Sequence, residues 1–203
     1  MQYHFTPGEA PMKRQLLRIS AAAGILLAAS AATANAQGFG VTAGATFSKL
    51  SGDDVSGEEN KTGFAGGVFY EFKAGEALVI RPELLYIMKG TGAEGTDENF
   101  SLDYIQLPIL VKYKFGSGTT KPFLMIGPAF GMNVNCDSFG FDCSDEDELE
   151  KLEISGIIGG GVQIKQFDVN VRYDMGLTDV IDGSDVKNMT WVIMLGYNFT
   201  MPQ

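Results

Sequence analysis

The stretch "FDVNVRYDMG" (residues 167–176) alternates without a break between apolar and polar side chains. Its odd-numbered positions are apolar, and its even-numbered positions include Asp168, Arg172 and Asp174. Successive side chains of a strand point to opposite faces, so the segment has one apolar face and one charged face. The pattern fits a half-buried strand of a soluble protein with its apolar face inward, and equally a membrane strand whose apolar face meets lipid.

The N-terminal segment carries the features of an export signal in their usual order. Basic residues precede the apolar run "ISAAAGILLAAS", and "ATANAQ" follows with small residues at the positions of a cleavage site. We therefore predict that residues 1–36 are a cleaved secretory signal peptide and that residues 37–203 form the mature domain. A retained anchor is the alternative. Met12 is followed by two basic residues and is a candidate for the true start.

The predicted mature chain is strongly acidic. The whole sequence has 15 Lys and Arg against 25 Asp and Glu, and residues 1–36 hold three of the former and one of the latter. This leaves 12 basic and 24 acidic residues, a net charge of −12 that argues against nucleic acid as a partner. No later segment is long and apolar enough for a transmembrane helix, so any membrane crossing has to use strands.

Eight strand-like segments follow one another along the mature chain, and most are longer than strands of globular proteins. They cover residues 38–49, 62–72, 77–90, 101–115, 121–134, 152–164, 167–176 and 188–200. Short connections ("KAGE", "GSGTT", "KQ") alternate strictly with long acidic ones. Up-and-down hairpins with tight periplasmic turns and longer outer loops have this pattern, so we predict an all-β, eight-stranded antiparallel transmembrane barrel.

When the alternation of residues 167–176 is extended to the other strands, one face of the sheet has no charge and the other is polar. The polar face suits a narrow, crowded interior, since eight strands enclose little more space than side chains fill. Buried charges have to pair, so we interpret the interior as a salt-bridged plug; the alternative is a narrow proton- or ion-selective path. The predicted interior charge network consists of Glu71, Arg81, Glu83, Lys89, Lys112, Glu153, Asp168, Arg172 and Asp174.

Aromatic residues of the apolar face fall into two groups by their height along the strands. Two such girdles mark the membrane interfaces of a transmembrane barrel, whereas a soluble calyx would bury its aromatics without regard to height. One predicted girdle contains Phe39, Tyr70, Tyr113, Phe167, Tyr197 and Phe199, and the other contains Phe47, Phe64, Tyr86, Phe130, Tyr173 and Trp191.

Several segments taken together resemble a known family. "FGVTAGATFSKL", "GFAGGVFYEF", "VIRPELLYIMKG", "LDYIQLPILVKYKF", "KPFLMIGPAFG" and "LGYNF" are similar, in order and spacing, to the outer-membrane β-barrel domain family of Bacteroidetes, the PorT-like or porin-family proteins. The resemblance implies a barrel inserted into the bacterial outer membrane by the insertion machinery. It also implies, as an alternative function, an accessory role in secretion or transport. The chain departs from the family pattern because it continues past Phe199.

The chain has few residues of the types that enzymes and metal sites use, with one His and two Cys. The only histidine is His4, within the predicted signal peptide, so the mature chain has no His to serve as a general base and we expect no enzyme. Cys136 and Cys143 lie in the longest predicted loop, and an exported chain is expected to join them in a disulfide. The same loop is rich in Asp and Glu. We interpret this loop as solvated and acidic. The alternative is that it binds calcium or bridges to lipopolysaccharide through divalent cations.

The sequence thus predicts a small outer-membrane barrel with a filled interior and a structural or interaction role through acidic extracellular loops. The expected partners are outer-membrane lipid and lipopolysaccharide, the barrel-insertion machinery, and envelope or secretion proteins. No cofactor, catalytic residue or metal site is expected. The alternative functions are a secretion accessory and a narrow ion channel.

Overall fold

The structure, a computed structural model, describes residues 36–51, 58–93, 99–138, 141–142, 152–178 and 186–199. The predicted signal peptide lies outside these residues except for its last position, and its cleavage stays a prediction. The described residues form β1 (Ala36–Ser51), β2 (Glu58–Lys73), β3 (Leu78–Ala93), β4 (Asn99–Lys114), β5 (Thr120–Ser138), β6 (Phe141–Asp142), β7 (Leu152–Ile164), β8 (Phe167–Gly176) and β9 (Lys187–Asn198).

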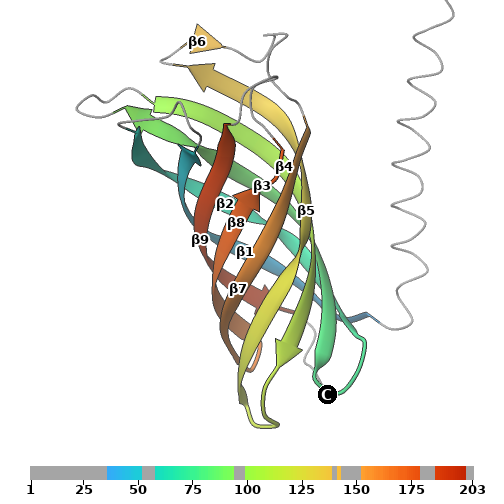
Figure 1. The fold of residues 1–203 in the computed structure, drawn as a ribbon. Coiled ribbons are helices and arrows are strands. Elements are labelled where there is room, and N and C mark those ends of the chain that lie inside the picture. The colour runs from blue at the N-terminus through green and yellow to red at the C-terminus, as the bar shows by residue number, and fades with distance from the viewer. Residues whose placement is uncertain are drawn as a thin grey trace, which may run out of the picture. The chain divides into compact units, whose positions relative to one another are not determined.

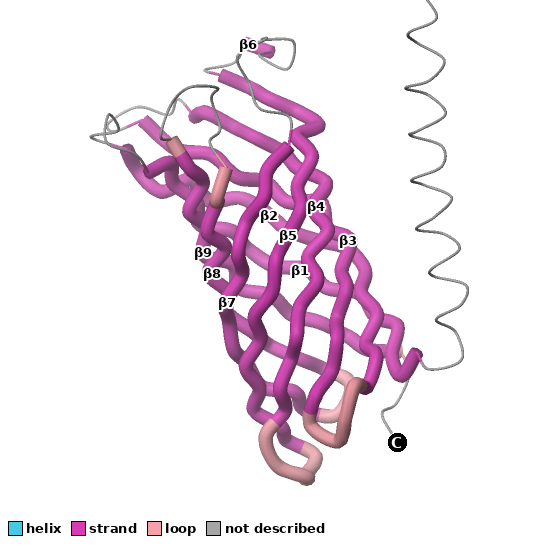
Figure 2. Tube along the Cα trace, turned by 45° about the vertical axis from the view of Figure 1, so that its right-hand side comes forward, coloured by secondary structure: helices cyan, strands magenta, loops and turns pink. Residues whose placement is uncertain are grey.

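The strands pair in the order β4-β3-β2-β1-β9-β8-β7-β5, and β4 also pairs with β5, which closes the sheet. β6 is a two-residue extension paired only with the end of β5. The predicted eight-stranded antiparallel barrel is therefore confirmed (Figure 1). The predicted bounds of β7 and β8 coincide with those observed. The short connections gather at one end of the barrel, drawn in pink at the bottom of Figure 2. We call this end the turn end and the opposite end the loop end.

The two faces of β8 now have known environments. Val171 is 42% exposed on the outside of the barrel, whereas its neighbour Asn170 is 1% exposed and points inward. The same alternation holds in β9, where Val192 is buried and Trp191 is exposed. An apolar outer surface around a charged interior is the arrangement of a barrel in lipid, not of a soluble calyx. Among the described residues, no helix is long and apolar enough to cross a membrane.

The prediction of a polar interior is only partly right, because the inward face also buries apolar side chains. One cluster packs Leu85, Ile87, Leu102 and Tyr104 with other inward residues toward the loop end. A second cluster joins residues of β4, β5 and β7, including Leu110 and Phe123. Strand parity shows which side a residue faces, but both faces of these strands contain apolar residues, so the interior could not be classified from the outward face alone.

The aromatic residues of the outer surface contact one another within each predicted girdle. Phe39 stacks on Tyr70 and on Phe199, with ring centroids 5.1 and 5.6 Å apart. At the other level, the rings of Tyr173 and Trp191 lie 4.8 Å apart. The remaining ring contacts join Tyr70 to Phe72, Tyr113 to Phe115, Phe167 to Tyr197 and Tyr197 to Phe199.

The distance between the two girdles follows from the geometry of β1. Phe39 and Phe47 lie on the same face of this strand, and each belongs to a different girdle. At about 3.3 Å per residue and a strand tilt of roughly 40°, they are separated by roughly 20 Å along the barrel axis. This spacing is close to the height of the apolar band of outer-membrane barrels, about 25 Å.

Cys136 does not lie in a loop as predicted. β5 continues to Ser138, so Cys136 belongs to this strand, pairs with Leu102 of β4 and is 1% exposed. The strand is longer than its apolar outer pattern indicated, because its last residues pair with β4 and then with β6. Cys136 is not a free thiol, and Cys143 lies outside the described residues, so the disulfide between them stays a prediction.

Candidate functional site

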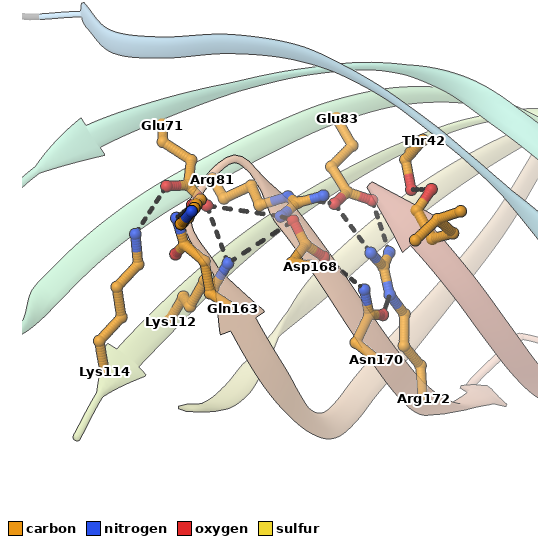
Figure 3. A network of polar contacts seen from close by, with 12 residues as sticks. Thr42, Glu71, Arg81, Glu83, Lys112, Lys114, Gln163, Asp168, Asn170 and Arg172 are labelled. Carbon is orange, nitrogen blue, oxygen red and sulfur yellow. Dashed lines mark hydrogen bonds and ion pairs between the residues drawn. The ribbon is translucent and has the colours of Figure 1, made fainter. Parts of the chain in front are cut away.

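A closed ring of charged and amide side chains crosses the barrel interior (Figure 3). Arg81 on β3 donates from Nε to Glu83 Oε1 at 2.7 Å and from Nη1 to Asp168 Oδ2 at 2.8 Å. Arg172 on β8 donates from Nη1 and Nη2 to Glu83 at 2.5 and 3.0 Å, and from Nε to Asn170 Oδ1 at 2.7 Å. Asn170 Nδ2 completes the ring by donating to Asp168 Oδ1 at 2.8 Å.

The ring joins two strands that lie on opposite sides of the barrel. β3 and β8 are four strands apart in either direction around the closed wall, so they face each other across the interior. Each strand supplies alternate residues to the ring, because residues two apart in a strand point to the same side. The ring thus ties opposite walls of the barrel together and fills the space between them.

Glu71 on β2 extends the ring toward the turn end. Its carboxylate accepts hydrogen bonds from Lys112 Nζ at 2.9 Å, Lys114 Nζ at 2.8 Å and Arg81 Nη1 at 3.4 Å. We call the whole group the turn-side network; it comprises Glu71, Arg81, Glu83, Lys112, Lys114, Asp168, Asn170 and Arg172.

Aromatic rings cover part of this network. The guanidinium carbon of Arg81 lies 3.6 Å from the ring centroid of Phe69, and Lys112 Nζ lies 3.9 Å from that of Phe123. Cation–π contacts of this kind are strongest where water is excluded. The two aromatic side chains therefore stabilise the cations while taking up interior volume.

A second group of charges, the loop-side network, lies nearer the long loops. Lys89 Nζ pairs with Glu153 Oε2 at 2.7 Å and with Asp174 Oδ2 at 2.9 Å. Gln106 Nε2 donates to Asp174 Oδ2 at 2.8 Å, and Asn188 Nδ2 donates to Glu153 Oε1 at 3.0 Å. These contacts also cross the interior, because Lys89 on β3 and Asp174 on β8 come from opposite walls.

Apolar side chains share the interior with the two networks. Leu85 follows Glu83 on the inward face of β3, and Ile157 and Val192 project inward from β7 and β9; each of the three is 3% exposed. No ion pair between side chains of the described strands joins the turn-side network to the loop-side network. The ion pairs of the described strands therefore form two separate groups.

The two networks nearly balance their own charges. The turn-side network has four cations and three anions, and the loop-side network has one cation and two anions. Buried charges are tolerated when they are paired and hydrogen-bonded, and such pairs fix geometry more reliably than they add stability. The arrangement is suited to holding the barrel shut.

All nine charges that the sequence predicts for the interior belong to one of these networks. The structure divides them into two groups and supplies partners that parity did not identify, above all Lys114. Asp103 was also missed: it is 5% exposed and accepts hydrogen bonds from Tyr86 Oη at 2.7 Å and Asn135 Nδ2 at 3.1 Å. It lies at a register shift between β4 and β5, where simple alternation no longer holds.

The described residues contain no candidate metal site, and they leave out most of the acidic loop. Within them, no group of three or more His, Cys, Asp and Glu side chains is arranged to hold a metal ion. Calcium binding by the acidic loop therefore stays a prediction, since most of that loop lies outside the described residues.

Comparisons with known proteins agree on the fold. The family described as "Outer membrane protein beta-barrel domain" matches residues 29–182. The crystal structure of Neisserial surface protein A is similar with a TM-score of 0.52 and 16% identity, covering 79% of this chain and 97% of the other. The outer membrane enzyme PagL is similar with a TM-score of 0.50 and 15% identity, covering 77% and 98%.

A third solved structure is the attachment invasion locus protein Ail of Yersinia pestis, with a TM-score of 0.49, 18% identity and coverage of 81% and 99%. No protein with a curated description matches the sequence. At these identities the first two solved structures, one of which is an enzyme, show the fold alone.

Proposed function

Because the chain belongs to the outer membrane protein β-barrel domain family, we propose that it is a closed barrel that acts through its extracellular loops and not through a pore. The ring between Arg81, Glu83, Arg172, Asn170 and Asp168 supports this proposal most directly, since it spans the interior from β3 to β8. Passage of a metabolite would require these pairs to separate and leave buried charges without partners, which is costly.

The charge distribution supports a role for the loops. The long connections contain most of the acidic residues, and segment 145–148 alone reads "DEDE". Blocks of like charge stay hydrated and serve as interaction surfaces. We infer that the loops bind cationic partners or bridge to lipopolysaccharide through divalent cations, and that the structural role is envelope integrity or adhesion.

A loop variant tests this function. Asp145, Glu146, Asp147 and Glu148 are changed to their amides, which keeps the loop length and side-chain size. The variant is expected to reach the outer membrane normally, while cells carrying it attach less to a cationic surface or admit more of a hydrophobic dye. If attachment and dye entry both equal those of the unchanged protein, the loops do not carry the function.

The accessory role in secretion, which the narrower PorT-like resemblance implies, is the second candidate. Chemical crosslinking in native outer membranes separates the two. A stoichiometric complex with secretion proteins that survives the loop change supports the accessory role, whereas a barrel without such a complex supports the first proposal. In either case we infer that lipid, lipopolysaccharide and the barrel-insertion machinery are partners.

We also infer that the barrel is not an enzyme. The single histidine of the sequence, His4, lies outside the described residues and ahead of the barrel. The carboxylates of the interior are engaged by Arg and Lys, as Glu83 is by Arg172, so they are poorly placed to act as general bases toward a substrate. Incubation of the refolded protein with outer-membrane lipids should leave the acyl chains intact.

A further inference from the structure

The turn end of the barrel opens into a cavity of about 520 Å³. Its lining comes from the ends of β2, β3, β4, β5 and β7 and from the tight turns that connect them. These turns are tied to their neighbours, since Lys114 N donates to Ala77 O at 2.8 Å and Lys165 N donates to Thr119 O at 3.1 Å. A cavity of this size is in the range of small-molecule sites, about 300–1,000 Å³.

Four lysines line this cavity against a single carboxylate, that of Glu76. We call Lys73, Lys114, Lys121 and Lys165 the basic mouth. The excess of cations is unexpected in a mature chain with twice as many acidic as basic residues. It sets the turn end apart from the opposite end, where the acidic loops begin.

Among the described residues, turns included, no carboxylate forms an ion pair with two of the cations of the basic mouth. Lys114 pairs with Glu71, but no carboxylate of the described strands pairs with the ammonium groups of Lys121 or Lys165. Lysine ammonium groups that converge on a concave, partly desolvated surface attract anions, and they act as point charges without a preferred bidentate geometry. Ser117 and Thr119 add hydroxyl groups to the same lining.

From these observations we propose that the basic mouth binds a small anion with two or more phosphate or carboxylate groups. In an outer-membrane barrel the short turns face the periplasm, so the ligand arrives from that side. Lys114 belongs both to the lining of this cavity and to the turn-side network, where it pairs with Glu71. The paired side chains of this network fill the interior beyond the mouth, so the anion is held at the mouth and does not pass through the barrel.

Isothermal titration calorimetry on the protein refolded in an uncharged detergent tests the proposal, with pyrophosphate and citrate as probes at low salt. At least one probe should bind saturably, and added salt should weaken the binding because exposed charges are screened. Pyrophosphate and citrate distinguish phosphate from carboxylate preference. Absence of saturable binding with both probes would overturn the proposal.

Charge variants locate the site. The double change Lys121→Gln with Lys165→Gln should lower the affinity about tenfold or more, and the matching changes to Arg should largely preserve it. Lys49→Gln is the control, since Lys49 is an exposed lysine at the loop end of β1. An equal loss of affinity in the control would show that only net charge matters and would refute the site.

Two checks keep this test independent of folding and of the loop function. Each variant should migrate faster on unheated gels than after heating, as a folded barrel does. The loop variant with four amides at 145–148 should bind the probes as the unchanged protein does. A loop variant that loses probe binding would contradict a site at the turn end.

Discussion

Asn170 and Val171 show how far environments differ between adjacent residues in this barrel. Asn170 is 1% exposed and bridges Asp168 and Arg172, while Val171 is 42% exposed on the outer wall. The pleat of a strand turns one side chain into the charged interior and the next toward lipid. The effect of a substitution on stability therefore depends on contact with lipid at position 171 and on the charged interior at position 170.

At Val171 we predict that shape matters little and charge matters strongly. Val171→Arg should lower the free energy of unfolding by about 2–4 kcal/mol because the site lies near the middle of the lipid-facing band, and Val171→Leu should change it little because lipid accepts either shape. Urea unfolding in lipid vesicles measures both. A fluorescent label should be quenched by brominated lipid chains at 171 but not at 170, and the reverse pattern would contradict this orientation.

Arg81 is the residue on which most partners of the turn-side network depend. Arg81→Leu leaves Glu71, Glu83 and Asp168 with one cation fewer in a buried site, and removing one partner of a buried pair typically costs about 3–5 kcal/mol. Lys114→Met is the matched control: it also removes a cation from Glu71, but the Lys114 side chain is 13% exposed and Glu71 keeps two other cations. Equal losses in urea unfolding would argue against the central position of Arg81.

At the scale of single strands, inward glycines make room for large side chains. A Cβ on Gly40 of β1 would lie 2.2 Å from Phe69 Cζ and 2.4 Å from Tyr197 O. Phe69 in turn lies against Arg81. The bulk of the aromatic and arginine side chains on one wall therefore requires the absence of a side chain on the neighbouring strand.

Gly40→Ala is predicted to destabilise the barrel by about 1–3 kcal/mol, the usual cost of overpacking, because one of its contacts is a backbone oxygen that cannot yield. Gly156→Ala in β7 is the control, since a Cβ there meets no atom within 4 Å. Thermal or urea unfolding followed by gel mobility compares the two. A similar cost at both positions would show that the effect is one of strand propensity alone.

The end of β5 offers a prediction for the cysteines. Cys136 lies in the strand and is buried, and Cys143 follows it closely in the sequence. We expect neither to react with an alkylating reagent in freshly isolated membranes until a reductant is added, because an oxidising compartment favours the disulfide. Mass spectrometry detects the modification. Alkylation of Cys143 without reduction would exclude the bond.

For the whole molecule, closure of the interior determines what can cross it. The two networks tie opposite walls together, and the inward side chains of Leu85, Ile157 and Val192 add apolar bulk to the same interior. Planar-bilayer recordings should show no stable conductance at the nanosiemens level, with a large trimeric porin as the positive control. A reproducible channel of that size would refute the plug, and a small cation-selective current would support the ion-path alternative.

The sequence by itself determined the orientation of nearly every strand residue. Alternation is a local property of the backbone, so the run from Phe167 to Gly176 already separated lipid-facing Val171 from inward Asn170 and Arg172. The charge-free face, the spacing of the turns and the length of the strands then led to an eight-stranded barrel, because only a closed sheet satisfies its backbone in lipid.

Only the tertiary structure decided which inward residues meet. Arg81 and Asp168 are 87 positions apart and touch because closure brings β3 opposite β8. The same closure gathers Lys114, Lys121 and Lys165 around one cavity and packs apolar side chains beside the two networks. Parity tells the direction of a side chain but not its height relative to residues of other strands. That height depends on strand register and tilt, which are set by the pairing of the whole sheet.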